Sequence, residues 1–399
     1  MNRFLILSNG HGEDLSGSLL ACKLIANGNH VDALPLVGSG NEYKKNGIRI
    51  ISKTRNFNTG GLGYNSLKGR INDLFNGQII YFFQKMFIIF FVRKNYDYLI
   101  AVGDIVPIFI SWLSGKKYFI YLVAYSSHYE GKLRLPWPCK YFLRSSNVLR
   151  IYSRDLLTSY DLTNQLKREV IFLGNPFMDN LSSDKKKYDD SFDIALLPGS
   201  RSNELRNNFH LMLDLLERIS SNKYFEKINF SFALIFNFKI DSVQELLEKR
   251  DWRFVNKSSH PDELIYRFKF IKVKFKWHSF EKILNRCDFA ISMAGTAAEQ
   301  VIGIAKPVIQ IEGLGPQFTK SFAEAQRRLL GEYVFCYSNY INKEDQLNGT
   351  INLILNIIYL IKLDTYFLKG CQKIASNRIG KKGATLRMIS DIEKSINYA

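Results

Sequence analysis

Residues Phe289–Gln300 read FAISMAGTAAEQ: an apolar run of four residues, a turn of small residues and the start of a helical pattern. Such a run is typical of a strand that leads into a helix of a parallel α/β sheet. The small side chains of residues 294–298 leave room for a diphosphate to reach the amides at the helix start. One turn further on, Glu299 or Gln300 is suited to bond ribose hydroxyls. Close packing of the helix against the sheet is the alternative interpretation.

Short β-rich apolar runs alternate with longer helical patterns along the rest of the chain, which is the signature of βαβ units. In the first half we expect strands near Phe4–Leu7, Tyr98–Val102, Tyr118–Val123, Leu149–Tyr152 and Val170–Leu173. In the second half we expect strands near Ile194–Leu197, Phe230–Ile235, Ile271–Phe275, Phe289–Ser292, Val308–Ile311 and Tyr333–Cys336. After Asn342 the pattern is helical to the end. The sequence therefore predicts an α/β protein with two Rossmann-like series of strands.

The length of 399 residues exceeds the size at which one hydrophobic core usually stops growing, so two domains are expected. The polar segment 182–191, which contains three consecutive lysines, interrupts the hydrophobic pattern as an exposed linker does. We expect a Rossmann-like domain over 1–181 and a second one over 192–375. A C-terminal helix within 376–399 is expected to pack back on the first domain. Ligands of open α/β sheets bind beyond the carboxyl ends of the strands, so functional residues are sought in strand-to-helix turns.

Basic residues outnumber acidic ones, with 55 Lys and Arg against 37 Asp and Glu, and the formal net charge is +18. This balance favours anionic lipid, nucleic acid or phosphorylated small molecules as partners. Zinc-finger and RNP motifs are absent from the sequence, so no nucleic-acid partner is predicted and an anionic membrane surface is favoured. The five cysteines are isolated from one another, which is typical of reduced thiols in a cytoplasmic protein.

Two apolar segments are relevant to the question of membrane association. Met1–Ser8 lacks the length and cleavage site of a signal peptide and is predicted to be the first strand. Ile79–Val92 is interrupted by Gln84 and Lys85 and falls short of the roughly 18 apolar residues of a spanning helix. It has few polar residues for a solvated face, so we expect part of it, with the basic Arg93–Lys94 pair, to lie on a membrane surface. A buried crossover helix is the alternative.

Two turns of the first half carry acidic residues directly after a predicted strand. The turn SNGHGED ends at Asp14, and its residues suited to bind an acceptor substrate are Gly10, His11, Gly12 and Glu13. A tight turn with helix-capping acids is the alternative, since the third glycine of a dinucleotide fingerprint is absent. Asp104 follows the strand 98–102 and is our first choice as general base, with Asp14 as the second. An N-cap on the next helix is the alternative for Asp104.

Three turns of the second half carry residues suited to a phosphorylated ligand. Gly199 and Ser200 would offer amides at a helix start, and Arg201 a guanidinium for phosphate oxygens; a solvated Arg is the alternative. Gln317, in a glycine-rich turn, would hold sugar hydroxyls. Trp277 would flank a nucleobase, with a place in the core as the alternative. The six histidines show no metal-binding spacing, and no metal site is predicted.

With these turns located, the chain resembles glycosyltransferases of the two-Rossmann (GT-B) type, and most closely the lipid-A-disaccharide synthase family. The strongest carriers are LPGSR at 197–201 with Glu204, and GTAA at 295–298. The order of the weaker motifs also matches, through Asp14, Asp104, Ser126–His128 and Gly174–Pro176. Gln300 stands where the family has a ribose-binding Glu.

The resemblance implies two domains facing a central cleft and an inverting, metal-independent transfer that uses no cofactor. A hexosamine-type sugar would pass from a UDP-sugar to a lipid-linked acceptor, at the cytoplasmic face of a membrane to which the protein is peripherally bound. The expected donor site consists of Gly199, Ser200, Arg201, Ala294, Gly295, Thr296, Glu299, Gln300, Trp277 and Gln317. A nucleotide-sugar 2-epimerase, which needs no lipid, is one rival interpretation. A non-catalytic nucleotide-sugar-binding protein is another, and Gln300 is the feature that favours it.

Overall fold

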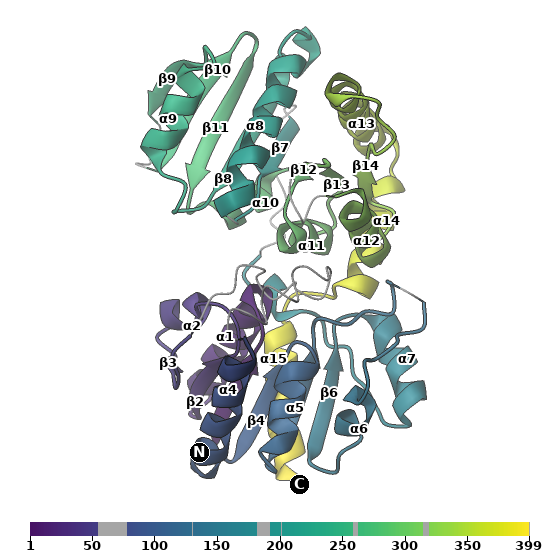
Figure 1. The fold of residues 1–399 in the computed structure, drawn as a ribbon. Helices are drawn as coiled ribbons and strands as arrows, with labels where there is room; N and C mark the ends of the chain where they lie inside the picture. Colours follow the sequence, from purple (N-terminus) through teal and green to yellow (C-terminus); the bar gives the residue numbers. More distant parts are fainter. Residues whose placement is uncertain are drawn as a thin grey trace. The chain divides into compact units, whose positions relative to one another are not determined.

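In a computed structural model the chain divides into two compact units, Met1–Asp179 with Gly380–Ala399, and Asn180–Ile379 (Figure 1). The structure describes residues 1–54, 78–129, 131–181, 192–200, 202–257, 262–313 and 319–398. The expected linker, 182–191, lies outside the described residues.

The first unit contains a six-stranded parallel sheet in the order β3-β2-β1-β4-β5-β6. Its strands are β1 Arg3–Ser8, β2 His30–Pro35, β3 Arg49–Ile50, β4 Tyr98–Val102, β5 Lys117–Leu122 and β6 Val148–Ser153. Its helices are α1 His11–Ala26, α2 Asn41–Lys45, α4 Gln78–Val92, α5 Ile105–Leu113, α6 Cys139–Leu143, α7 Leu156–Leu166 and α15 Ala384–Asn397, with the 3₁₀ turns η2 Arg93–Asn95 and η3 Pro176–Met178. This is the doubly wound order, in which the direction of winding reverses between β1 and β4.

Both faces of this sheet are covered, as the apolar strands require. In β1, Leu5 and Leu7 belong to a core cluster that includes Ile89 of α4 and Ile108 of α5. Phe4 and Ile6 belong to the cluster of the opposite face, which the helices α1 and α15 complete. Successive residues of one strand thus hold helices on opposite faces of the sheet.

Four of the expected strands in the first half are confirmed as β1, β4, β5 and β6. The fifth was wrong: residues 170–173 contribute only an isolated parallel bridge between Tyr152 and Ile171. β2 and β3 were not predicted. In β2 the charged Asp32 interrupts the apolar pattern that indicates a strand. The structure nevertheless buries it, at 3% exposure, where it accepts a hydrogen bond of 2.6 Å from the hydroxyl of Tyr96.

The last helix, α15, belongs to the first unit and packs against α1. Its own N-cap is Gly383, which has no side chain to accept from the first amides. Asp179 serves instead: its carboxylate accepts from the amides of Gly383, Ala384 and Thr385 at 2.6, 3.0 and 2.8 Å. At the other end of the contact Tyr152 donates to Asp391 over 2.8 Å. Asp179, the last residue of the segment Met1–Asp179, therefore binds the start of the C-terminal segment Gly380–Ala399.

Replacing Asp179 by Ala is expected to lower the free energy of unfolding of the first unit by about 1–2 kcal/mol, because three amides lose their acceptor. In a unit of this size the melting temperature would fall by roughly 2–8 °C, which circular dichroism would measure. Asp241→Ala is the control, since Asp241 is an exposed acid in the first turn of α9, in the second unit, and is not its N-cap residue. A loss no greater than the control's would contradict the capping role.

The second unit repeats the architecture with an eight-stranded sheet in the order β14-β13-β12-β7-β8-β11-β10-β9. Its strands are β7 Phe192–Leu197, β8 Ile228–Leu234, β9 Arg253–Lys257, β10 Glu263–Phe268, β11 Ile271–Trp277, β12 Phe289–Ser292, β13 Val308–Gln310 and β14 Val334–Cys336. Its helices are α8 Ser202–Ile219, α9 Ile240–Glu248, α10 Phe280–Arg286, α11 Gly295–Gly303, α12 Lys320–Leu330, α13 Lys343–Leu363 and α14 Phe367–Arg378, with the 3₁₀ turn η4 Lys223–Lys227. Six strands pair in parallel in the doubly wound order, and β10 joins β11 and β9 antiparallel.

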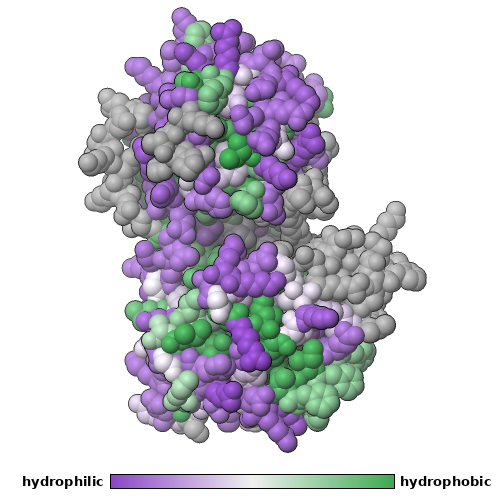
Figure 2. Space-filling model, turned by 90° about the vertical axis from the view of Figure 1, so that its left-hand side faces the viewer, coloured by the Kyte–Doolittle hydropathy of each residue, from purple (hydrophilic) through white to green (hydrophobic). Residues whose placement is uncertain are grey.

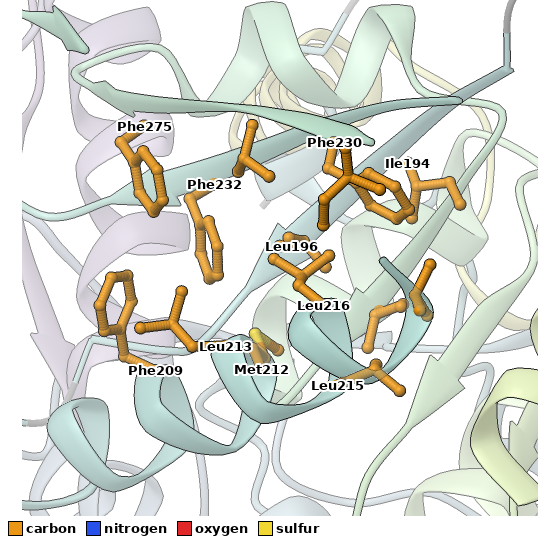
Figure 3. Close-up of a cluster of buried hydrophobic side chains, with 14 of the residues drawn as sticks. Ile194, Leu196, Phe209, Met212, Leu213, Leu215, Leu216, Phe230, Phe232 and Phe275 are labelled. Atoms are coloured by element: carbon orange, nitrogen blue, oxygen red, sulfur yellow. The ribbon is translucent and has the colours of Figure 1, made fainter. Parts of the chain in front are cut away.

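The core of this unit lies between the sheet and α8. Phe209, Met212, Leu213 and Leu216 recur at helical spacing and pack on the strands, where the rings of Phe232 and Phe275 stack at 5.0 Å (Figure 3). All six expected strands of this half are confirmed, as β7, β8, β11, β12, β13 and β14. The two strands at one end of the sheet, β10 and the edge strand β9, were not predicted, because charged residues are interspersed among their apolar ones.

The expected helical end of the chain is confirmed by α13, α14 and α15. In the described part of the chain no single helix has the length and apolarity to span a membrane, and α13 and α14 meet that test only as a pair bent by 101°.

Candidate functional site

In the first unit the candidate site lies where the winding of the sheet reverses, between the carboxyl ends of β1 and β4. Ser8 ends β1 and is followed by Asn9 and Gly10, and Gly103 and Asp104 follow β4. The side-chain amide of Asn9 donates to Asp104 Oδ2 over 2.9 Å and so joins the two turns. A crevice at this point is where open α/β sheets bind ligands. The structure therefore brings the two acidic turns singled out by the sequence to one place.

Asp104 is the N-cap of α5, as the alternative interpretation expected: Oδ1 accepts from the amide of Val106 over 2.9 Å. The residue is nevertheless only partly buried, so a ligand can reach it. Burial raises the pKa of Asp104 above its usual range, and the hydrogen bonds from Val106 and Asn9 only partly oppose this. A carboxylate with a raised pKa accepts a proton more readily near neutral pH. Capping and proton acceptance are therefore compatible at this residue.

Glu13 lies over two glycines of this edge. A Cβ on Gly10 would stand 2.6 Å from Glu13 Oε2, and a Cβ on Gly103 would stand 3.3 Å from Glu13 Cγ. Both glycines have positive φ, 147° and 134°, which other residues rarely adopt. Gly12 lies in the first turn of α1, and the side chain of His11 lies outside the described residues. The structure therefore brings Glu13 and Asp104 to the same sheet edge.

Asp14 is 1% exposed and faces inward. Oδ1 accepts from the Ser8 hydroxyl over 2.6 Å, and the Tyr43 hydroxyl donates to Ser8 Oγ over 3.0 Å. Oδ2 is buried with no hydrogen-bond partner among the described residues. Burial raises the pKa of Asp14 to about 7, with a smaller rise from Glu42 and an opposing effect of the Ser8 bond. A ligand hydroxyl does not reach so buried a group, so of the two predicted bases Asp104 is the more accessible.

The buried Asp14 predicts a pH-dependent stability. Its carboxyl titrates near the ordinary value of 3.8 in the unfolded chain and near 7 in the folded one. Between these values the folded protein binds more protons, so the stability of the wild type falls as pH rises from about 4 to about 7. Asp14→Asn removes this loss, and at pH 8 the variant should gain on the order of 2–4 kcal/mol relative to its difference at pH 4.

Urea unfolding of wild type and Asp14→Asn at pH 4, 6 and 8 measures this gain. Asp97→Asn is the control, since Asp97 is exposed. If the two Asn variants shift alike with pH, Asp14 is ionised at no unusual cost and the raised pKa is wrong.

In the second unit the corresponding reversal lies between β7 and β12, and the two strongest sequence motifs meet there. The amide of Met293 donates to the carbonyl of Leu197 over 2.8 Å, so the turn after β12 lies against the end of β7. Gly199 has φ 101°, and a Cβ on it would stand 3.1 Å from the carbonyl oxygen of Met293. Only glycine combines this conformation with so close an approach. The LPGS and MAGT turns therefore form one edge.

The helix α11 starts at this edge, and its N-cap residue makes no side-chain hydrogen bond to the first amides. Its N-cap is Ala294, which cannot accept a hydrogen bond through its side chain. Gly295 has space around it, with Phe322 and Gln326 at 3.5 and 3.7 Å from a Cβ placed there, and Thr296 is exposed. Uncapped amides at a helix start and the helix dipole attract anions. The start of α11 can therefore take a phosphate group.

The remaining donor residues have mixed outcomes. Trp277 is a correction: it is 3% exposed in the core and its indole N–H donates to the carbonyl of Phe238 over 2.7 Å, so it does not stack on a base. Ser200, next to Gly199, is exposed. In α11, Gln300 is buried and Glu299 is half-buried. Arg201 and Gln317 lie outside the described residues.

The sequence did not single out Asn9 and Ser8, which orient the two aspartates. The only feature of the sequence that could have identified them is their position at the end of the first predicted strand. Among the described residues no group of three or more His, Cys, Asp and Glu side chains is arranged to hold a metal ion.

No protein-family model matches the chain, and no curated protein matches it in sequence. Solved structures match it over nearly its whole length. The co-structure of MnaA from S. aureus with UDP has a TM-score of 0.56 at 13% identity and covers 100% of this chain and 98% of its own. The glycotransferase of kitacinnamycin has a TM-score of 0.55 at 11% identity, with 99% of each chain covered. UDP-GlcNAc 2-epimerase from Neisseria meningitidis, bound to UDP-GlcNAc, has a TM-score of 0.50 at 12% identity, with 98% of this chain and 100% of its own covered. These likenesses show that the chain has the GT-B fold of two Rossmann-like units.

Proposed function

We propose that the protein is a glycosyltransferase that uses a UDP-sugar and acts on a lipid-linked acceptor, as the resemblance to lipid-A-disaccharide synthases implies. The observation that carries the proposal is the position of the motifs. In each unit, residues chosen from the sequence meet at the point where the winding of the sheet reverses. The first unit offers carboxylates there, and the second offers uncapped helix amides. That division of chemistry fits an acceptor site and a donor site.

In the donor role, the amides at the start of α11 bind the diphosphate, and Arg201 supplies a positive charge to it. The hydroxyl of Thr296 and the amides of Gly199 and Ser200 add donors on the same edge. Charge develops on the diphosphate as it leaves, so donors that are already in position lower the barrier. Glu299 or Gln300 bonds the ribose.

In the acceptor role, Asp104 removes the proton of the acceptor hydroxyl. The hydroxyl oxygen forms a bond to the anomeric carbon while the bond from that carbon to the diphosphate oxygen breaks, and the configuration inverts. The proton ends on the carboxylate of Asp104, and the nucleoside diphosphate leaves with the electron pair of the broken bond. No metal or cofactor takes part in the proposed step. Gly10, Gly12, His11 and Glu13 bind the acceptor beside the base.

The lipid character of the acceptor is supported by the surface of the first unit. Phe83, Phe87, Phe90 and Phe91 of α4 are 51, 61, 55 and 76% exposed. Figure 2 shows hydrophobic surface on the face of this unit turned to the viewer. Beyond α4 lie Arg93, whose guanidinium is 4.3 Å from the centre of the Phe90 ring, and the exposed Lys94. Apolar side chains edged by positive charge suit the interface of an anionic membrane, and we propose peripheral binding to the cytoplasmic face of one.

A UDP-GlcNAc 2-epimerase is the second candidate, because an enzyme of that name has the same fold over 98% of this chain. An epimerase needs acid–base groups beside the sugar, which the carboxylates of the first unit can provide, but it needs no lipid. The exposed phenylalanines of α4 favour the transferase.

Incubation of the protein with radiolabelled UDP-GlcNAc and membrane lipid extract tests the proposal. Label in the lipid phase, dependent on the protein, is the expected result. Conversion of UDP-GlcNAc to its 2-epimer without added lipid would establish the second candidate instead. Binding without either reaction would indicate a non-catalytic protein.

A further inference from the structure

Two buried glutamines of the second unit have polar atoms without a hydrogen-bond partner among the described residues. Gln310 is 1% exposed, and neither its Oε1 nor its Nε2 has a hydrogen-bond partner among the described residues. Gln326 is 6% exposed, and its Oε1 is likewise unpartnered in the described part of the chain. An unpaired buried polar group is costly, and most are paired in native proteins. Two such amides in one unit therefore require an explanation.

Both glutamines lie at the edge that carries the donor motifs. Gln310 is the last residue of β13 and is the register partner of Ser292, the last residue of β12. Gln326 comes from α12, and its Nε2 stands 3.7 Å from where a Cβ on Gly295 would be. The amide group of Gln326 therefore lies beside the start of α11, and Gln310 ends the strand next to β12 at the same edge of the sheet.

The chemistry of the two side chains points to hydroxyl groups. A primary amide is neutral and offers both a donor and an acceptor, as a hydroxyl does, whereas a phosphate gains more from charged donors and from helix amides. Two residues beyond Gln310, the buried Glu312 accepts from Tyr340 over 3.1 Å and keeps Oε1 unpartnered among the described residues. This free oxygen of Glu312 can accept a hydrogen bond from a hydroxyl.

We propose that Gln310 and Gln326 bind the glycosyl hydroxyls of the nucleotide-sugar, next to the diphosphate at the start of α11. This inference rests on the proposed function and adds the residues that distinguish a nucleotide-sugar from the bare nucleotide. Bound sugar supplies the missing partners, so the cost of burying the amides falls only on the empty protein.

This arrangement predicts opposite effects on stability and binding. Gln310→Met and Gln326→Met keep the length of the side chain but remove the unpaired groups. Without ligand, each variant should melt about 2–4 °C higher than wild type. Its dissociation constant for UDP-GlcNAc should rise on the order of tenfold, whereas that for UDP should change less than twofold.

Gln346→Met is the matched control, because Gln346 is also buried but its Nε2 donates to the carbonyl of Glu312 over 2.8 Å. That variant should melt lower than wild type and keep the wild-type ratio of affinities for UDP-GlcNAc and UDP. Calorimetry gives the affinities, and scanning fluorimetry gives the melting temperatures.

The outcomes separate this inference from the proposed function. If wild type binds neither UDP-GlcNAc nor UDP-glucose, the proposed function fails, and this inference with it. If wild type binds UDP-GlcNAc but the glutamine variants keep the wild-type ratio, only the glycosyl assignment is overturned. Equal weakening of UDP and UDP-GlcNAc would assign the glutamines to the ribose and also overturn it.

Discussion

Asp104→Asn is expected to reduce sugar transfer by on the order of 10²–10⁴-fold while leaving the affinity for UDP unchanged. The amide occupies the same space but cannot take the proton of the acceptor hydroxyl. Its oxygen can still accept from the amide of Val106, so the cap of α5 is retained. Asn9 must turn its side-chain amide to present oxygen to the new NH₂ group, which is a local adjustment.

The pH profile of the wild type provides a second readout. Burial raises the pKa of Asp104, and the base acts only when ionised. Transfer measured as kcat/KM should therefore fall as pH is lowered through this raised pKa, and the residual activity of the variant should lack that limb. Unchanged melting temperature and unchanged UDP affinity are the controls for folding. Near-normal transfer by the folded variant would move the base to Glu13, the other carboxylate at this edge that is not buried.

Much of this site was predictable because strand-to-helix turns of a parallel sheet are local in sequence. The apolar runs that end before Asn9, Asp104, Gly199 and Ala294 identify strand ends, and the order of strands then brings those ends together in pairs. Glycines were informative for a physical reason. Gly103 and Gly199 adopt positive φ at points where a Cβ would press on a neighbouring turn.

Features that depend on tertiary contacts were not predictable in the same way. Neither the burial of Asp14 nor its pairing with Ser8 follows from the local pattern, and the core position of Trp277 depends on a carbonyl 39 residues away. The unpartnered state of Gln310 is likewise a property of its surroundings. Sequence periodicity carries no information about which buried polar group has a partner.

The helix α4 has one property that the sequence predicted and one that it did not. The sequence predicted an exposed apolar surface interrupted by Gln84 and Lys85. Gln84 is exposed, but Lys85 is 2% exposed and its ammonium donates to Ser52 Oγ and the carbonyl of Lys53 at 2.6 and 2.8 Å. Burial lowers the pKa of Lys85 to about 8. This lysine holds α4 to the first unit and does not add charge to the outer surface, which is more uniformly apolar than its sequence indicated.

Changing Phe87, Phe90 and Phe91 together to Ser is expected to abolish salt-sensitive binding to liposomes that contain anionic lipid. These rings are 61, 55 and 76% exposed, so their loss costs the folded protein little packing. Each ring that enters the interface contributes about 1 kcal/mol, and the three together amount to roughly a 10²-fold change in partitioning. Arg93 and Lys94 contribute on the order of 1 kcal/mol each, which added salt screens.

Co-sedimentation with vesicles of neutral and of anionic lipid at low and high salt measures this binding. The matched control changes three exposed aromatic residues of the second unit to Ser: Phe236, Tyr359 and Tyr366, which are 75, 61 and 76% exposed. The control should bind anionic vesicles as wild type does. If loss of aromatic surface anywhere on the protein weakened binding, both variants would bind less. If the wild-type protein does not bind anionic vesicles, the main physical support for a lipid acceptor is lost. The epimerase would then be the stronger candidate.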